Sequence, residues 1–131
     1  MDTMRSWIFR GVGNLMGRQG DKTLAQAKAA LVYDLVGDAL SGARCYWDMG
    51  VLAMDGSQIT EAREQFKRAL SLFRKADKAD SIGRVLRRLA RLEPEEERRR
   101  NLVRAAAAAW ATTGRRDLMA ELDSAFRDWK R

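Results

Sequence analysis

The strongest constraint on the fold of this chain is that helix-forming residues dominate it from end to end. Ala, Arg and Leu are the commonest residues, runs of Val, Ile and Thr are absent, and Pro94 is the only proline among 131 residues. Because the common residues have high helix propensity and proline is the strongest helix breaker, helices are expected nearly everywhere. The sequence therefore predicts an all-α protein of about six to seven helices packed as antiparallel hairpins.

Apolar residues at spacings of three and four, interrupted by turn-forming residues, divide the chain into successive helices. The expected ranges are 4–17, 21–41, 43–54, 59–76, 79–92, a helix that starts near Pro94 and ends before Gly114, and 116–129. Residues 1–20 are expected to form an N-terminal amphipathic helix or arm, and residues 21–131 a single helical domain.

The helix expected over 21–41 begins at Asp21, a suitable N-cap, and contains Gly37 in its interior. A glycine inside a helix often marks close packing, since it otherwise costs about 1 kcal/mol. Gly42 is expected to separate this helix from the next. The stripe expected to be buried consists of Leu24, Ala27, Leu31, Leu35 and Ala39.

Residue types that carry most catalytic and metal chemistry are scarce in this sequence. The chain has no histidine, and Cys45 is its only cysteine. Ser-His and Cys-His nucleophile pairs, histidine-based metal sites and an internal disulfide are therefore excluded. Asp34 and Asp38 share one predicted helix face, but paired carboxylates need a pocket and a shifted pKa for acid–base work. We expect a non-enzymatic protein without cofactor or metal.

The lone cysteine also fits a reducing compartment, since disulfides are rare there. Apolar runs stay far below the roughly 18 to 20 residues that a membrane span needs. The sequence thus favours a cytoplasmic protein, or one from another reducing compartment, with peripheral membrane association as an open alternative.

Positive charge is concentrated in the second half of the chain. The net charge is +7; residues 1–65 hold 7 Lys and Arg against 8 Asp and Glu, whereas residues 66–131 hold 18 against 10. Such asymmetry is typical of proteins that bind an acidic partner, nucleic acid or an anionic surface. An arginine-rich, solvated face is the alternative interpretation.

The arginines of the helix at 79–92 lie opposite its apolar face. With the arginines that follow Pro94 they predict a basic ridge, which consists of Arg84, Arg87, Arg88, Arg91, Arg98, Arg99, Arg100 and Arg104. Guanidinium groups bind carboxylates and phosphates well, so the ridge favours an acidic peptide or an RNA backbone. Aromatic residues for base stacking are missing from it, which weakens the nucleic-acid interpretation. Two pairs, Glu95–Arg99 and Glu96–Arg100, are expected to stabilise the helix after Pro94.

The clearest pattern lies between residues 43 and 76. An aromatic (Tyr46 or Trp47) precedes a small residue, Gly50; a turn at Gly56 follows, and the next helix reads Ala-x3-Phe-x2-Ala, at Ala62, Phe66 and Ala69. This segment resembles one tetratricopeptide repeat, a family of stacked helical hairpins with a right-handed superhelical path. Met49 stands where that family usually has Leu, and its usual proline after the second helix is absent.

A second, altered copy of this pattern follows. Gly83 follows Gly50 at a spacing close to the family period, while the second-helix pattern reappears about three helical turns late, at Ala106, Trp110 and Thr113. The resemblance implies packing roles for Gly50, Ala62, Phe66, Ala69, Gly83, Ala106 and Trp110. It also implies a partner-binding groove along the first helix of the clear repeat, lined by Arg44, Trp47, Val51 and Met54.

The start of the chain forms a further candidate interaction element, expected over residues 4–17. Trp7, Ile8, Val12 and Leu15 share one face of the predicted helix, which carries arginines at its flanks. The stretch is too short and interrupted for a secretory signal. It could pack on the domain, dock on a partner or lie in a membrane interface.

Together these features favour an adaptor or an accessory or assembly subunit of a larger complex, which binds a protein partner, such as an acidic peptide, through a tetratricopeptide-like surface. The first alternative is a small RNA-associated basic protein that uses residues 84–104, and the second a peripheral membrane protein anchored by residues 4–17. Because helical arrays need about three repeats or capping helices, a homo-oligomer is also open.

Overall fold

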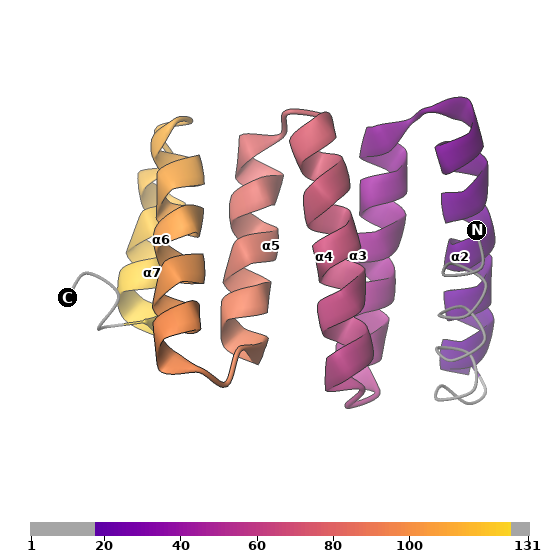
Figure 1. Cartoon of the computed structure of the whole chain (residues 1–131), viewed down its shortest axis with the longest axis horizontal. Helices are drawn as coiled ribbons and strands as arrows, with labels where there is room; N and C mark the ends of the chain where they lie inside the picture. Colours follow the sequence, from indigo (N-terminus) through magenta and orange to yellow (C-terminus); the bar gives the residue numbers. More distant parts are fainter. Residues whose placement is uncertain (1–17, 127–131) are drawn as a thin grey trace. The chain divides into compact units, whose positions relative to one another are not determined.

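The computed structural model describes residues 18–126, which form six helices joined by short turns (Figure 1). No strand occurs in this range, so the predicted all-α class is confirmed. Across the described residues, no helix combines the length and apolar character that crossing a bilayer requires. The helices are α2 (Arg18–Val36), α3 (Ala39–Asp55), α4 (Ile59–Lys75), α5 (Ala79–Leu92), α6 (Glu96–Ala111) and α7 (Arg116–Ala125).

The helix predicted over 4–17, with Trp7, Ile8, Val12 and Leu15, lies outside the described residues. The limits of α4 and α5 agree closely with the predicted 59–76 and 79–92. Helix α7 is predicted to end at residue 129 but ends at Ala125. The next residue, Phe126, has φ of −133° and so leaves helical geometry.

Three turns share one geometry and recur at equal intervals along the chain, at Gly37, Ser57 and Asp77. These residues have positive φ values of 74°, 59° and 54°. In each turn this residue donates its amide to the carbonyl three residues earlier, and the next amide reaches the carbonyl five residues earlier. This is the Schellman motif, which ends a helix with a left-handed residue. Gly114, with φ of 68°, ends α6 in the same way.

The boundary between α2 and α3 corrects the sequence prediction. Gly37 is not a packing glycine inside a helix, because a Cβ atom there would meet nothing within 4 Å. Its left-handed φ instead ends α2, and Asp38 caps α3 by accepting a hydrogen bond from the Ser41 amide at 3.0 Å. The predicted break at Gly42 is therefore wrong, and Ala39 is the first residue of α3.

Contacts divide the chain into two compact units, residues 1–72 and 73–131, and the division falls inside α4. In the first unit α3 contacts both α2 and α4: a Cβ at Gly42 would lie 3.8 Å from Cβ of Tyr33 and 3.3 Å from Cδ1 of Leu72. The large side chains buried in this unit are Tyr46, Met49, Phe66 and Leu70.

In the second unit α5 packs on α6 and α6 packs on α7. Trp110 is its largest fully buried side chain. The other large buried apolar residues of this unit are Phe73, Val85, Leu86, Leu89, Val103, Leu118 and Leu122.

Helix α2 buries its small side chains and exposes its large ones. Ala27 and Ala30 are each 1% exposed, whereas Leu24 is 37% and Leu35 78% exposed. The prediction that Leu24 and Leu35 belong to the buried stripe is therefore wrong, although Ala27 is buried as expected. Small residues allow α2 and α3 to approach closely, and this packing leaves the larger apolar residues of α2 at the surface.

Candidate interaction surfaces

The contact between α3 and α4 depends on Gly50. A Cβ atom at this position would lie 2.6 Å from Cε1 of Phe66, closer than real contacts allow. Phe66 is fully buried, and so are Ala62 and Ala69 on the same helix. Trp47 packs against Phe66, with ring centroids 5.2 Å apart at 58°. The structure thus brings together Gly50 and Phe66, two members of the predicted packing set.

The predicted groove residues Arg44, Trp47, Val51 and Met54 follow one another at intervals of three or four along α3 and share one side of it. Arg44 is exposed, and the other three are partly exposed. The contact with Phe66 holds the Trp47 ring in place. This side of α3 therefore presents a partly exposed apolar strip with a cation at its edge.

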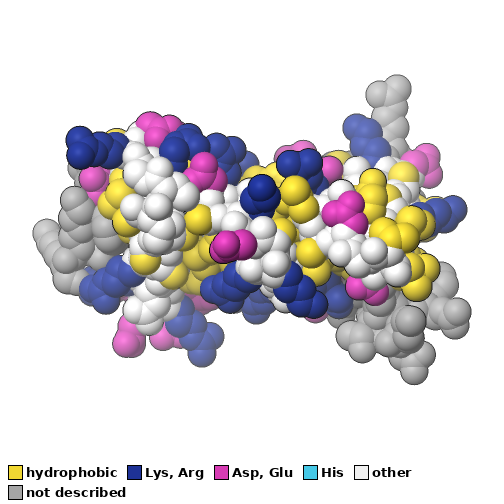
Figure 2. Space-filling view, turned by 90° about the horizontal axis from the view of Figure 1, so that it is seen from above, with side chains coloured by type: hydrophobic (Ala, Val, Ile, Leu, Met, Phe, Trp, Pro, Cys, Tyr) yellow, Lys and Arg dark blue, Asp and Glu magenta, His cyan; other side chains and the backbone are white. Residues whose placement is uncertain are grey.

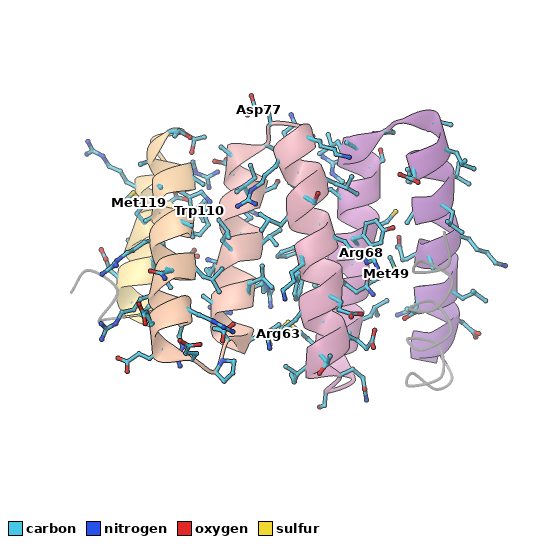
Figure 3. All side chains as sticks on the ribbon, viewed as in Figure 1. Met49, Arg63, Arg68, Asp77, Trp110 and Met119 are labelled. Carbon is cyan, nitrogen blue, oxygen red and sulfur yellow. The ribbon has the colours of Figure 1, made fainter. Side chains whose placement is uncertain are left out.

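Two further contacts of α3 lie beside this strip. Asp48 accepts a hydrogen bond from Nε2 of Gln26 at 3.4 Å, and burial raises the pKa of its carboxyl. Arg68 reaches from α4 toward α3, where its guanidinium carbon lies 6.0 Å from the ring centroid of Tyr46 (Figure 3). The first contact joins α2 to α3 and the second joins α4 to α3, so the helix that carries the strip is held by two neighbours.

Trp110 has the corresponding central place in the second unit (Figure 3). A Cβ at Gly83 would overlap its indole ring, so this glycine makes room for it between α5 and α6. The indole Nε1 donates to the carbonyl oxygen of Asp80 at 3.0 Å. Arg87 covers the ring, with its guanidinium carbon 5.5 Å from the centroid, and pairs with Glu121 of α7. Trp110 of α6 thus contacts α5 directly, and the arginine that covers its ring links α5 to α7.

The two glycines are not equivalent within their helices. Gly50 is the twelfth residue of α3, whereas Gly83 is the fifth residue of α5. Because α3 begins at Ala39 and α5 at Ala79, the hairpin period is longer than the roughly 34 residues of a tetratricopeptide repeat. The spacing between the glycines thus does not place them in register. The two glycines have one local feature in common: each makes room for a large aromatic ring of the following helix.

The arginines of the predicted basic ridge do not form one continuous surface. Those of α5 lie on one side of it, but Arg98, Arg99 and Arg100 are consecutive, so they span about 200° around α6. Arg98 pairs with Glu95 at 2.9 Å, and Arg100 with Glu96 at 2.7 Å. Several ridge arginines are therefore already partly neutralised within the chain.

Arg99 behaves differently from its prediction. Instead of pairing with Glu95, it donates to the carbonyl oxygens of Glu93 and Pro94, each at 3.2 Å. Its guanidinium thus holds the turn between α5 and α6. Of the remaining ridge residues, Arg84, Arg91 and Arg104 are exposed, while Arg88 is partly exposed.

An ion-pair cluster that the sequence prediction missed joins the start of α5 to the start of α7. Arg115 donates to Asp80 at 2.7 Å and to Asp117 at 2.9 Å. A hydrogen bond from Thr113 lowers the pKa of Asp80, and the bonds from Arg115 lower that of Asp117 to about 2. Asp80 and Arg115 are far apart in the sequence. Predicting this pair would require knowing how α5, α6 and α7 are aligned with one another.

Two further groups that could take part in chemistry are the carboxylate of Asp38, which caps a helix, and the thiol of Cys45, which is buried. The side chain of Asp38 accepts hydrogen bonds from Ser41, which lowers its pKa, so this carboxylate serves as a helix cap. Cys45 is buried, and burial raises the pKa of its thiol. Among residues 18–126 no three potential metal-ligand side chains of His, Cys, Asp or Glu gather.

Comparison of the chain with protein-family models, with curated proteins and with solved structures finds no match.

Proposed function

We propose that this protein is a non-enzymatic adaptor, or an accessory or assembly subunit, that binds a protein partner through the Trp47 side of α3. This surface consists of Arg44, Trp47, Val51 and Met54. The observation that carries the proposal is the placement of Trp47, partly exposed and packed on the buried Phe66. The resemblance of residues 43–76 to a tetratricopeptide repeat, whose first helix lines the binding groove, supports the same surface.

The physical basis lies in how binding energy is distributed in interfaces. Tryptophan and arginine are the commonest residues that dominate affinity, particularly where they are fixed before binding. Trp47 loses little freedom on binding because Phe66 already holds it. Arg44 is exposed one helical turn away and can pair with a carboxylate. The preferred partner is therefore a peptide segment with an apolar anchor beside an acidic residue.

The test is affinity purification of tagged full-length protein from its native cells, with and without nuclease, followed by mass spectrometry. A partner that survives nuclease is then compared between wild type, Arg44→Glu and Arg91→Glu. Both arginines are exposed, so the two variants carry the same charge change on different units.

We expect Arg44→Glu to reduce recovery of the partner at least about tenfold, which corresponds to roughly 1.4 kcal/mol. Arg91→Glu should retain the partner, and circular dichroism should show both variants folded. Equal recovery with the two variants would contradict the proposed surface. Loss of every partner with nuclease would instead favour nucleic acid as the ligand.

A further inference from the structure

The side of α2 opposite to α3 is apolar and largely exposed. It carries Ala25, Ala29, Val32 and Val36, at intervals of three and four, so these residues form one stripe. Val32 is 56% and Val36 70% exposed. In Figure 2 hydrophobic side chains gather on the part of the molecule where Figure 1 places α2. Lone exposed apolar residues are common, but a continuous helix stripe marks a contact surface.

The corresponding positions of α3 indicate what kind of contact the outer stripe of α2 can make. At the same distances from the turn that follows, α3 carries Cys45, Met49 and Leu52, of which Cys45 and Met49 are buried. Helix α3 has a neighbour on both sides, α2 and α4, and the stripe that contains Cys45 and Met49 is covered. The outer stripe of α2 thus has the register of a surface that accepts another helix.

The sequence before α2 repeats the turn signal of the other helices. The left-handed turn residues Asp77, Ser57 and Gly37 are equally spaced, and one more step of the same length leads back to Gly17. Glycine is the residue that most readily adopts positive φ, and the described part of α2 follows it from Arg18 onward. The same turn would therefore reverse the chain at Gly17.

We infer that residues 4–16 form a further helix that packs antiparallel on the outer stripe of α2. The occupant has matching chemistry, since Ile8, Val12 and Leu15 share one helix face. This contact involves a different helix from the partner surface on α3 and stands independently of the proposed function. The N-terminal segment thus packs on its own chain, rather than on a partner or in a membrane interface.

Known contacts fix the register of this packing. Gly42 and Leu72, which approach each other, are equally far from the turn residue Ser57. The hydrogen-bonded pair Gln26 and Asp48 is placed in the same way about Gly37. Contacting residues thus lie equally far before and after the turn residue. Around Gly17 the same rule places Ile8 level with residue 26, so the nearest residue of the outer stripe is Ala25.

The experiment is disulfide formation in the full-length protein. Two variants carry Cys45→Ala to remove the native thiol, together with Ile8→Cys. The first adds Ala25→Cys and the second, as matched control, adds Val36→Cys on the same stripe. A disulfide requires Cα atoms within about 7 Å, and the control position lies further along the helix by roughly 16 Å.

With the mild oxidant diamide, we expect the first variant to form an intramolecular disulfide at least about tenfold faster than the control, because the packing raises the effective thiol concentration. Equal rates in the two variants would overturn the inference. So would disulfides that form only between molecules and depend on protein concentration, since these would assign the stripe to a second copy.

A second measurement does not depend on new cysteines. Trypsin cleavage at Arg10 should be at least about tenfold faster in Ala25→Glu/Ala29→Glu than in wild type, because charges on the stripe expel the segment and open it to the protease. The control Ala108→Glu/Ala111→Glu introduces the same charges at two exposed positions of α6 and should leave the cleavage rate unchanged. Unchanged cleavage in the α2 variant would also refute the packing.

Discussion

Gly50 provides the most direct test of how α3 and α4 pack. In Gly50→Ala the added Cβ would lie 2.6, 2.8 and 2.9 Å from three ring carbons of Phe66, whereas ordinary contacts are 3.4 to 4 Å. The ring must move by several tenths of an ångström to relieve this overlap. It is fully buried and packed against Trp47, so a shift of the ring displaces further side chains.

Two opposing effects set the magnitude. Overpacking a core costs about 1 to 3 kcal/mol, while replacing glycine by alanine inside a helix contributes about 1 kcal/mol of stability. The net change for Gly50→Ala is therefore a destabilisation of up to about 2 kcal/mol, and Gly50→Leu should cost more. Gly42→Ala is the control within the same helix, because its closest neighbour is the flexible end of Leu72 at 3.3 Å and the next, Cβ of Tyr33, lies at an ordinary 3.8 Å. There the propensity gain should prevail, with a net effect near zero or stabilising.

Urea denaturation followed by circular dichroism measures both changes in the free energy of unfolding. The double variant Gly50→Ala/Phe66→Leu should recover part of the loss, because the smaller side chain removes the overlap. If Gly50→Ala were stabilising by about 1 kcal/mol, as at an open helix position, α3 and α4 would not touch there and the packing argument would be refuted.

Three further predictions concern single side chains. Trp110→Phe should lower the free energy of unfolding by about 1 to 3 kcal/mol in urea denaturation, since it removes the hydrogen bond to Asp80 and leaves a void; a neutral result would contradict a central role for the indole. The pKa of Asp117 in the folded protein, about 2, lies below its ordinary value of 3.8, so its contribution to stability is complete above pH about 4 and is lost as the pH falls through 2. Melting temperatures of wild type and Asp117→Asn should therefore differ at pH 6 and converge toward pH 2, whereas a constant difference would rule out this ion pair as the cause. The Cys45 thiol, buried and with a raised pKa, should react with a thiol reagent at least about tenfold more slowly in the folded than in the urea-unfolded protein; equal rates would show that the site is open.

The surface proposals differ in how far they depend on the structure. The choice of the groove residues depends on a resemblance alone, and the structure adds that Trp47 packs on Phe66. The prediction of the basic ridge depends on helical spacing, which is informative on α5. It fails on α6 because consecutive arginines cannot share a helix face and because Glu95, Glu96 and backbone carbonyls engage several of them.

The sequence by itself determined the all-α class and the limits of α4 and α5, and the resemblance to a tetratricopeptide repeat placed Gly50 and Phe66 in one packing set. These features depend on helix propensity, turn residues and short spacings, all of which are visible in the chain. A left-handed residue that ends a helix is also a local feature, but the sequence predicts Gly37 to be a packing glycine because a φ value cannot be read from residue types alone.

Only the tertiary structure decided which side of each helix is buried and which charges meet. Helix α2 carries one stripe of small residues and others of larger ones, and periodicity cannot rank them. Packing on α3 buries Ala27 and Ala30 because close approach gains more contact than the leucines would. Likewise Arg115 pairs with Asp80, and Arg87 with Glu121, across long stretches of sequence, beside the buried Trp110. Such pairings depend on the register between distant elements, which no local pattern specifies.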